Sequence, residues 1–366
     1  MDLGLIIEWV IKGVVLLLIG LAGFSYLTLY ERKVLARMQV RVGPNRAGPF
    51  GLLQPIADGV KLIFKEELIP AEADRLIFIL APVITVVPAL IIMAVIPFGP
   101  PISLFGRTIE LSVAGNNSLG ILYITTVASI SVYGIVLAGW SSNNKYATLG
   151  GIRSTAQMIS YELALGLAFI GPILMSSSMN LFKIVQDQAP MAWYAFYQPL
   201  GALIFLIATL AEVNRAPFDM PEAEQELTAG YHTEYSGMKF ALFFMAEYIK
   251  MIAVAVIAAT MYFGGYLGPF VNQFPFLGPF YLLIKVLVLL FGMIWVRATL
   301  PRLRYDRLMA FGWKLLLPLA IVNVLIVAFG IILNMELGVT LLFTPITSLV
   351  VMIGSISWVG WKLYRR

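Results

Sequence analysis

Long apolar windows alternate with shorter polar connections along the whole chain. Nine windows are apolar enough, and about long enough, to cross a hydrocarbon layer about 30 Å thick. Their apolar runs are continuous and do not alternate with polar positions, so the pattern predicts membrane-spanning helices and not barrel strands. The fifth and seventh windows are at the short end. The predicted spans are Trp9–Tyr30, Leu76–Phe98, Leu119–Trp140, Ala156–Met175, Ala195–Ala211, Phe240–Phe263, Phe280–Val296, Phe311–Leu333 and Val339–Trp361.

The composition agrees with this pattern. The chain is 60% hydrophobic and 12% charged, whereas soluble domains are roughly half apolar and about a quarter charged. We therefore expect an all-α polytopic membrane protein with about nine transmembrane helices. We find no internal repeat or low-complexity linker, so residues 1–366 are predicted to form a single membrane domain. Its main polar connections are residues 31–75, 212–239 and 297–310.

Basic residues are concentrated in every second connection. These connections and the C-terminal tail hold 20 of the 25 Lys and Arg residues, and the opposite loops hold only Arg107 and Lys183. The positive-inside rule then places the N-terminus outside and the C-terminus in the cytoplasm. A multi-pass protein of the cell inner (cytoplasmic) membrane is predicted. The net charge of +5 reflects this bias and does not call for a nucleic-acid partner.

Several kinds of chemistry are excluded by residue counts. The chain has no cysteine and one histidine, so it cannot form disulfides, thiolate-bound iron–sulfur clusters, a two-histidine haem site or a zinc site. We also find no glycine-rich nucleotide-binding loop. No metal or redox cofactor of its own is expected, and in any redox reaction the electrons must come from a partner.

The first polar connection predicts a short helix lying along the membrane surface. Gly43-Pro44-Asn45 forms a turn signal that presents Arg46, and Pro55 is placed to open a helix. One face of this helix is apolar (Ile56, Val60, Ile63, Phe64) and another is charged (Asp58, Lys61, Lys65). The helix is either a surface anchor for anionic lipid headgroups or a roof over a cavity between spans, with its charges facing a bound headgroup.

The second notable connection is acidic. Residues 212–234 hold six of the chain's 20 carboxylates together with Arg215 and the only histidine, His232, and Pro217 and Pro221 prevent one uninterrupted helix. A simple link between two helices needs no such charge density. This stretch indicates ion or proton handling, or docking of another subunit.

Ionisable residues also lie inside the predicted spans. They are Glu162, Glu212, Glu247, Lys250 and Lys285. Charge at the bilayer centre costs a few kcal/mol, so each residue is a candidate functional group. Glu247 and Lys250 are spaced to neutralise each other as an i,i+3 pair, and Glu162 and Glu212 are close enough to one face to reach interfacial water. Taken together, they favour a polar path through the protein.

Four long blocks resemble a known family. They are residues 31–62 (with GPNRAG), 139–163, 212–248 (with EAEQE) and 297–309. In these blocks the chain resembles the quinone-site membrane subunit of respiratory complex I, the proton-pumping NADH-quinone oxidoreductase, which animals encode in the mitochondrial genome. The resemblance covers nearly the whole chain and weakens before residue 31 and after about residue 333. Family members commonly have eight spans, so Val339–Trp361 is an additional one.

The resemblance implies a specific function. Such subunits form part of a quinone (ubiquinone) chamber with other membrane-arm subunits and the hydrophilic-arm quinone-site subunits, and link quinone reduction to proton translocation. Quinone is the substrate, and its tail enters between the first span, the interfacial helix and the sixth span. The positions matching chamber charges are Arg32, Arg41, Arg46, Asp58, Lys61 and Lys65, with Arg215, Arg297 and Arg302 near the arm junction. The positions matching the proton path are Asp219, Glu222, Glu224, Glu226 and Glu234, leading to Glu212, Glu162 and Glu247.

The residues alone are also compatible with two other classes of function. A related subunit of membrane-bound hydrogenases would keep the architecture without using quinone, and a stand-alone carrier would use the intramembrane charges as a substrate path. Copurification with an iron–sulfur protein argues against a carrier, and binding of a quinone analogue separates the first two. The GPNR and EAEQE blocks favour the quinone-reducing class.

Overall fold

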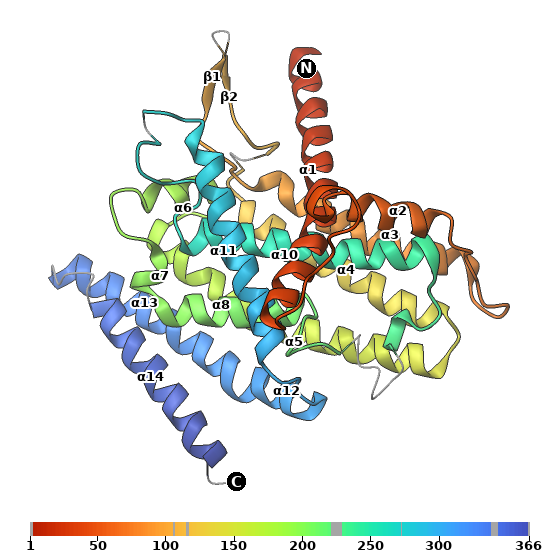
Figure 1. The fold of residues 1–366 in the computed structure, drawn as a ribbon. Helices are drawn as coiled ribbons and strands as arrows, with labels where there is room; N and C mark the ends of the chain where they lie inside the picture. Colours follow the sequence, from red (N-terminus) through yellow and green to blue (C-terminus); the bar gives the residue numbers. More distant parts are fainter. Residues whose placement is uncertain are drawn as a thin grey trace.

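The computed structural model describes residues 3–104, 107–114, 117–220, 229–271, 273–337 and 343–364. Helices make up most of these residues (Figure 1). The helices are α1 (Leu3–Met38), α2 (Gln54–Ile63), α3 (Arg75–Ile92), α4 (Gly120–Ser141), α5 (Lys145–Ser176), α6 (Leu181–Asp187), α7 (Tyr194–Tyr197), α8 (Pro199–Glu212), α10 (Gly237–Tyr262), α11 (Leu277–Thr299), α12 (Tyr305–Phe311), α13 (Leu317–Leu337) and α14 (Phe343–Tyr364). The shorter helical segments are η1 (Pro49–Gly51), η2 (Met93–Val95), η3 (Gly230–His232) and a π-helical stretch, η4 (Gly312–Leu316).

The predicted polytopic all-α architecture is confirmed. Within the described residues, seven helices are long and apolar enough to cross a membrane, with α12, η4 and α13 counted as one continuous helix. Two shorter apolar helices, α8 and α14, occupy the predicted fifth and ninth spans. The protein is therefore a multi-pass membrane protein, and the extra C-terminal span is a helix.

Some helix ends differ from the predicted spans because of local capping. The fourth span was expected to start at Ala156, but α5 already begins at Lys145, where the Asn144 side chain accepts a hydrogen bond from the Tyr146 N–H. The fifth span is interrupted at Gln198, after which Pro199 opens α8. As a result α8 has only 14 residues, a length of about 21 Å.

The one non-helical element among the described residues is a small hairpin. Strands β1 (Ile102–Leu104) and β2 (Arg107–Ile109) pair antiparallel, with Ile102 opposite Ile109. The apolar windows gave no sign of these strands, because they lie in the connection between the second and third spans. The hairpin stands beside the N-terminal part of α1 (Figure 1) and leaves the all-α class unchanged.

Helix α10 lies at the centre of the bundle and α1 at its edge. In the most apolar window of α10, 56% of residues are buried, compared with 11% in α1. From Ala253 to Tyr262 every residue of α10 is buried. A helix buried on all sides can carry polar side chains towards several neighbours at once, and α10 contacts α1, α3, α6, α8 and α11.

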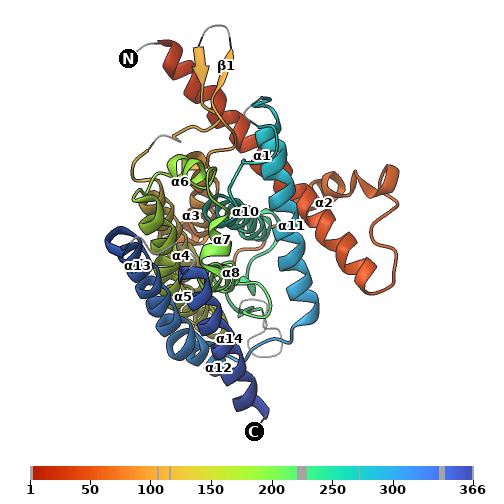
Figure 2. The ribbon, with the colours of Figure 1, turned by 90° about the vertical axis from the view of Figure 1, so that its left-hand side faces the viewer.

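The predicted interfacial helix is present as α2, with Pro55 in its first turn. Its apolar side chains do not pack into the bundle, since Ile56 and Ile63 are more than 60% exposed and Phe64 is 84% exposed. Figure 2 shows α2 and the end of α1 projecting to one side of the other helices. An exposed apolar face on a helix outside the bundle is typical of a membrane-surface helix.

The polar connections meet at one end of the bundle. The Asp74 N–H donates to the Ser141 carbonyl, Asn144 donates to Glu234, and Lys239 forms an ion pair with Glu67. These contacts join connections that lie two or four spans apart in the chain, as alternating helix directions require. Which membrane face this end occupies stays a prediction from the charge bias.

Glycines allow the helices next to the acidic connection to approach closely. A Cβ on Gly150 of α5 would lie 2.4 Å from the Cα atom of Gly230 in η3. A Cβ on Gly139 of α4 would lie 2.7 Å from the Ala147 carbonyl oxygen of α5. Because these neighbours are backbone atoms, they cannot move aside without shifting whole elements. The position of η3, within the acidic connection, therefore depends on these glycines.

We expect Gly150→Ala to destabilise the protein by about 1–3 kcal/mol, the usual cost of overpacking. The measurement is thermal unfolding of the purified protein in detergent. Gly292→Ala in α11 is the matched control, because a Cβ there would meet no atom within 4 Å and alanine favours a helix. Equal melting temperatures for the two variants would show that the close approach is not required.

Candidate functional site

A buried ion network joins four parts of the chain. Arg215, which follows α8, lies 3.0 Å from Glu31 of α1 and 2.5 Å from Glu247 of α10, measured between guanidinium nitrogen and carboxylate oxygen. Arg297 of α11 pairs with the same Glu31 oxygen. The side chains of Glu31 and Arg215 are each only 3% exposed. The network contains two carboxylates and two guanidinium groups, so its formal charges balance.

Tyr248 covers the network on one side. The Arg215 guanidinium carbon lies 4.3 Å from the centre of the Tyr248 ring, a favourable cation–π contact. Burial of charge is costly unless every partner is present, and removing one member of a buried pair typically costs about 3–5 kcal/mol. The network therefore fixes α1, α10, α11 and the end of α8 relative to one another.

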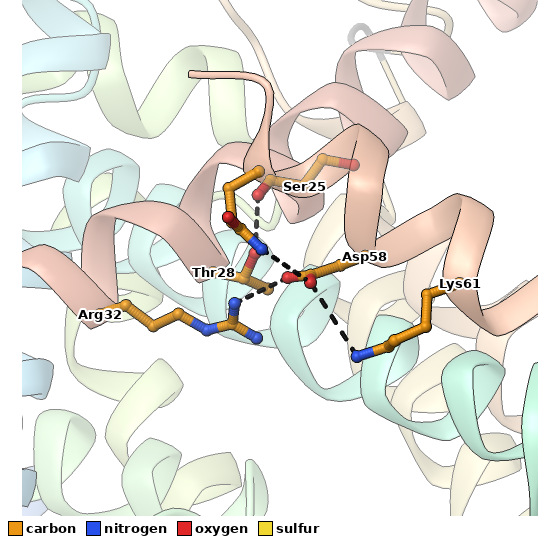
Figure 3. Close-up of polar contacts among 6 residues, drawn as sticks. Ser25, Thr28, Arg32, Asp58 and Lys61 are labelled. Carbon is orange, nitrogen blue, oxygen red and sulfur yellow. Dashed lines mark hydrogen bonds and ion pairs between the residues drawn. The ribbon is translucent and has the colours of Figure 1, made fainter. Parts of the chain in front are cut away.

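A second charged cluster lies where α1 meets α2 (Figure 3). Arg32 lies 2.6 Å from Asp58, and Gln54 donates a 3.0 Å hydrogen bond to the other carboxylate oxygen of Asp58. Lys61 lies 4.0 Å from Asp58 at a more exposed position. Asp58 thus holds the charged face of α2 towards α1, while the apolar side chains of α2 remain exposed.

A large open cavity lies beside this junction. Its volume is about 990 Å³, and its walls come from the end of α1, the loop that follows it and Phe291 of α11. Three cations border it, Lys33, Arg37 and Arg41, together with the Gly43-Pro44-Asn45 turn. A cavity of this size, with apolar walls and basic groups at its rim, can accept an amphipathic or anionic molecule.

Three further cavities follow one another through the bundle. The first, about 20 Å³, is bordered by Glu212, Glu247, Lys250 and Tyr231. The second, about 30 Å³, shares Glu212 and Lys250 with the first and is also bordered by Glu162. Each is large enough for about one water molecule. The third, about 700 Å³, shares Glu162 with the second and is an open groove along α4, α5 and Leu317 at the start of α13.

The carboxylates on this route are held by specific neighbours. Ser129 of α4 donates a hydrogen bond to Glu162. Gln157 of α5 donates to the Ala211 carbonyl at the end of α8, 2.8 Å away, and to the Phe218 carbonyl at 2.6 Å. The buried amide thereby fixes the helix end that carries Glu212.

The acidic connection is only partly described. Asp219 is 8% exposed, and Glu234 accepts a 2.6 Å hydrogen bond from Asn144. The other three predicted members of the acidic funnel, Glu222, Glu224 and Glu226, lie outside the described residues.

His232 is packed among aromatic rings. The rings of Tyr231, Phe240 and Phe243 lie within 5.5 Å of the imidazole, measured between centroids. Burial lowers the pKa of His232 to about 3, because desolvation disfavours the imidazolium. The only histidine is therefore neutral at physiological pH and serves the packing of η3.

The predicted site residues fall into separate groups. Arg32, Asp58 and Lys61 come together, Arg297 and Glu247 meet through Arg215 and Glu31, and Glu162 and Glu212 border one cavity. Arg46 and Lys65 are exposed, and Arg302 is partly buried. Within the described part of the chain, no group of three or more His, Cys, Asp or Glu side chains is arranged to hold a metal ion.

Glu31 is the main residue that sequence reasoning missed. It stands at the end of the first apolar window, directly before Arg32 and Lys33, and a carboxylate beside two cations gives no local sign of a distant partner. The signal that could have found it is Arg215, an arginine next to a membrane span that needs a counter-ion. Only the folded structure shows that this counter-ion is Glu31, which lies 184 residues before Arg215 in the sequence.

Comparison with known proteins identifies the family. The family model described as NADH dehydrogenase matches residues 11–328 of this chain. The chain belongs to the NADH dehydrogenase family. Similar members of this family include an NADH-quinone oxidoreductase subunit of Geobacter metallireducens, 52% identical with 90% of this chain and 96% of that protein covered. The corresponding NADH-quinone oxidoreductase subunit of Thermomicrobium roseum is 52% identical (87% and 94% covered), and subunit 8 of the Thermus thermophilus enzyme is 49% identical (93% and 92% covered).

The buried network generates a first test of the site in this family member. We expect Glu31→Gln to leave the two guanidinium groups with one carboxylate and to lower stability by about 3 kcal/mol or more. The measurement is thermal denaturation together with the amount of assembled complex on native gels. Glu66→Gln is the control, since Glu66 is exposed. Wild-type stability in Glu31→Gln would mean that the network does not hold the helices together.

Proposed function

We propose that this chain is the membrane subunit of an NADH-quinone oxidoreductase in which quinone reduction is coupled to proton movement. The names of the similar family members support the reaction. The absence of cysteine and the single histidine mean that a partner subunit supplies the electrons. Reduction to quinol takes up two electrons and two protons, so the site must also receive protons and tolerate transient negative charge.

The quinone is proposed to bind beside α1 and α2. The large cavity there has apolar walls and a cationic rim, which suits an isoprenoid tail and a headgroup that gains negative charge. The exposed apolar side of α2 suits a helix lying in the membrane surface, where a lipid-soluble substrate arrives. Arg32 and Asp58 stand at the α1–α2 junction. On this proposal Arg41, Arg46, Lys61 and Lys65 add to the charged surface around the entry. Arg297, which pairs with Glu31 at the end of α1, and Arg302 are assigned to the same site.

The proposed coupling rests on a single observation. Glu247 belongs both to the buried ion network and to the wall of the first small cavity. Glu247 pairs with Arg215, and so belongs to the network that includes Glu31 at the end of α1. The same carboxylate borders the first of the three cavities that lead through Glu212 to Glu162. A change of charge near α1 can therefore be felt electrostatically at the start of the route, because interactions in a low-dielectric interior are weakly screened.

Partners are proposed at both ends of this arrangement. Hydrophilic-arm subunits with redox centres would cover the polar end of the bundle, where the acidic funnel of Asp219, Glu222, Glu224, Glu226 and Glu234 would take up protons. Other membrane-arm subunits would cover the groove that borders Glu162. The charge bias of the connections supports a cytoplasmic location for the polar end.

We expect Asp58→Ala and Lys65→Ala to weaken turnover with long-tailed quinones while complex assembly stays near normal. Asp58→Ala should have the larger effect, because it releases both Arg32 and Gln54. Steady-state kinetics with long- and short-tailed quinones measures this. Asp306→Ala is the control, since its side chain is 76% exposed and far along the chain. Unchanged quinone kinetics in both variants would leave α2 as a lipid anchor only.

Glu212→Gln should assemble and bind a quinone analogue but lose most of its quinone-reductase turnover and proton pumping together. The amide keeps the size and hydrogen bonding of the carboxylate but cannot carry a proton or a negative charge. Glu247→Gln should behave similarly, with an added loss of stability because Arg215 is left with Glu31 alone.

The measurement is turnover and pumping of the complex in reconstituted vesicles, with assembly checked on native gels. Glu336→Gln is the matched control, because Glu336 is an exposed residue in the last turn of α13 and should tolerate the change. Full activity in Glu212→Gln would show that Glu212 does not carry protons and has a structural role only.

A further inference from the structure

Lys250 lies on the proposed proton route, and no ion pair among the described residues explains why a lysine stands there. Its side chain belongs to α10, is 7% exposed, and borders both small cavities together with Glu212. The i,i+3 pair with Glu247 that the sequence suggested is not formed, because Glu247 pairs with Arg215. Among the described residues, the Lys250 ammonium makes no ion pair or hydrogen bond, so the group faces the two cavities.

The formal charges of the ionisable groups near Lys250 can be added up. Glu247 is already matched, since it belongs to the balanced network of two carboxylates and two guanidinium groups. The cavities then bring together two further carboxylates, Glu212 and Glu162, and one cation, Lys250. Both carboxylates lie within electrostatic range of this ammonium, as does Glu247, whose charge is matched by Arg215.

While Lys250 is charged, this set of three groups is neutral in only one state of protonation. With Lys250 charged, one of the two carboxylates must be protonated and the other ionised. Two ionised carboxylates would leave a net negative charge inside the membrane, and two protonated ones a net positive charge. Either excess is disfavoured by a few kcal/mol in the hydrocarbon region.

We propose that Lys250 acts as a fixed positive charge that keeps one proton shared between Glu212 and Glu162. This inference rests on the proposed function, in which these carboxylates pass protons. It explains why a lysine is present at all. A proton can move along the route only if one carboxylate is protonated and the next is ionised. The fixed charge of Lys250 maintains this state, in which one of the two carboxylates carries a proton.

The titratable groups around Lys250 come from four elements. Glu162 comes from α5, Glu212 from α8, Glu247 from α10 itself and Tyr231 from η3. Helices α3 and α4 contribute the hydroxyl groups of Thr85 and Thr125, which do not titrate near neutral pH. Each cavity has room for about one water molecule, which can bridge two of these groups.

The test is Lys250→Met in the assembled complex, reconstituted in vesicles. Without the cation both carboxylates bind protons more tightly, so no vacant site remains at neutral pH. We expect pumping and coupled turnover to fall about tenfold at pH 7 and to recover on raising the pH by about one unit or more. Lys250→Arg keeps the charge, and should restore pumping and the wild-type pH profile.

Lys12→Met is the matched control, because Lys12 is a second lysine within an apolar span but pairs with Glu8 on α1 and borders neither small cavity. If Lys250→Met does not assemble on native gels, Lys250→Gln, which also lacks charge, carries the same expectation.

Two outcomes would overturn the inference. One is a neutral variant of Lys250 with wild-type pumping and an unshifted pH profile. The other is Lys250→Arg that assembles but is as defective as Lys250→Met, because a proton released by the lysine itself would then be needed. Loss of activity in Glu212→Gln alongside a normal Lys250→Met would contradict only this inference. An active Glu212→Gln would contradict the proposed function beneath it.

Discussion

The arrangement of the helices depends on one guanidinium group, that of Arg215. It lies 3% exposed between a carboxylate from α1 and one from α10, and a tyrosine ring covers its face. An arginine cannot lose its proton in a protein interior, so its charge must be matched by geometry. The peripheral helix α1 is mostly exposed along its length, and this buried pair is what ties its end to the central helix α10.

The membrane favours partners for the remaining polar groups. Many buried charges and amides in the described part of the bundle meet a partner or border a small cavity, as the hydrocarbon environment favours, although the buried amide oxygens of Gln198 and Asn323 accept no hydrogen bond. Gln157 illustrates this preference, since its amide satisfies the carbonyl at the end of α8 and another in the acidic connection. The chain thus builds a polar interior from single side chains on neighbouring helices, and α10 supplies two of them, Glu247 and Lys250.

Much of this could be predicted from the sequence, because apolar length and turn chemistry are local signals. The nine spans, the surface helix opened by Pro55 and the group of intramembrane carboxylates follow from such patterns. Partner choice is not local. The spacing of Glu247 and Lys250 suggested that they pair, but a guanidinium arriving from another connection takes Glu247. The importance of Glu31 and the shared walls of the cavities depend on contacts between distant parts of the chain.

The short helix α8 has an electrical consequence. Its 14 residues span about 21 Å, less than the roughly 30 Å thickness of the hydrocarbon layer. Buried polar residues of the acidic connection, including Asn214 and Asp219, fill part of the remainder. The insulating layer is thinner here, so the transmembrane voltage falls over a shorter distance. Moving one elementary charge through the full voltage involves about 2.3 kcal/mol per 100 mV, so at α8 this work is done over a shorter path than across a full-length span.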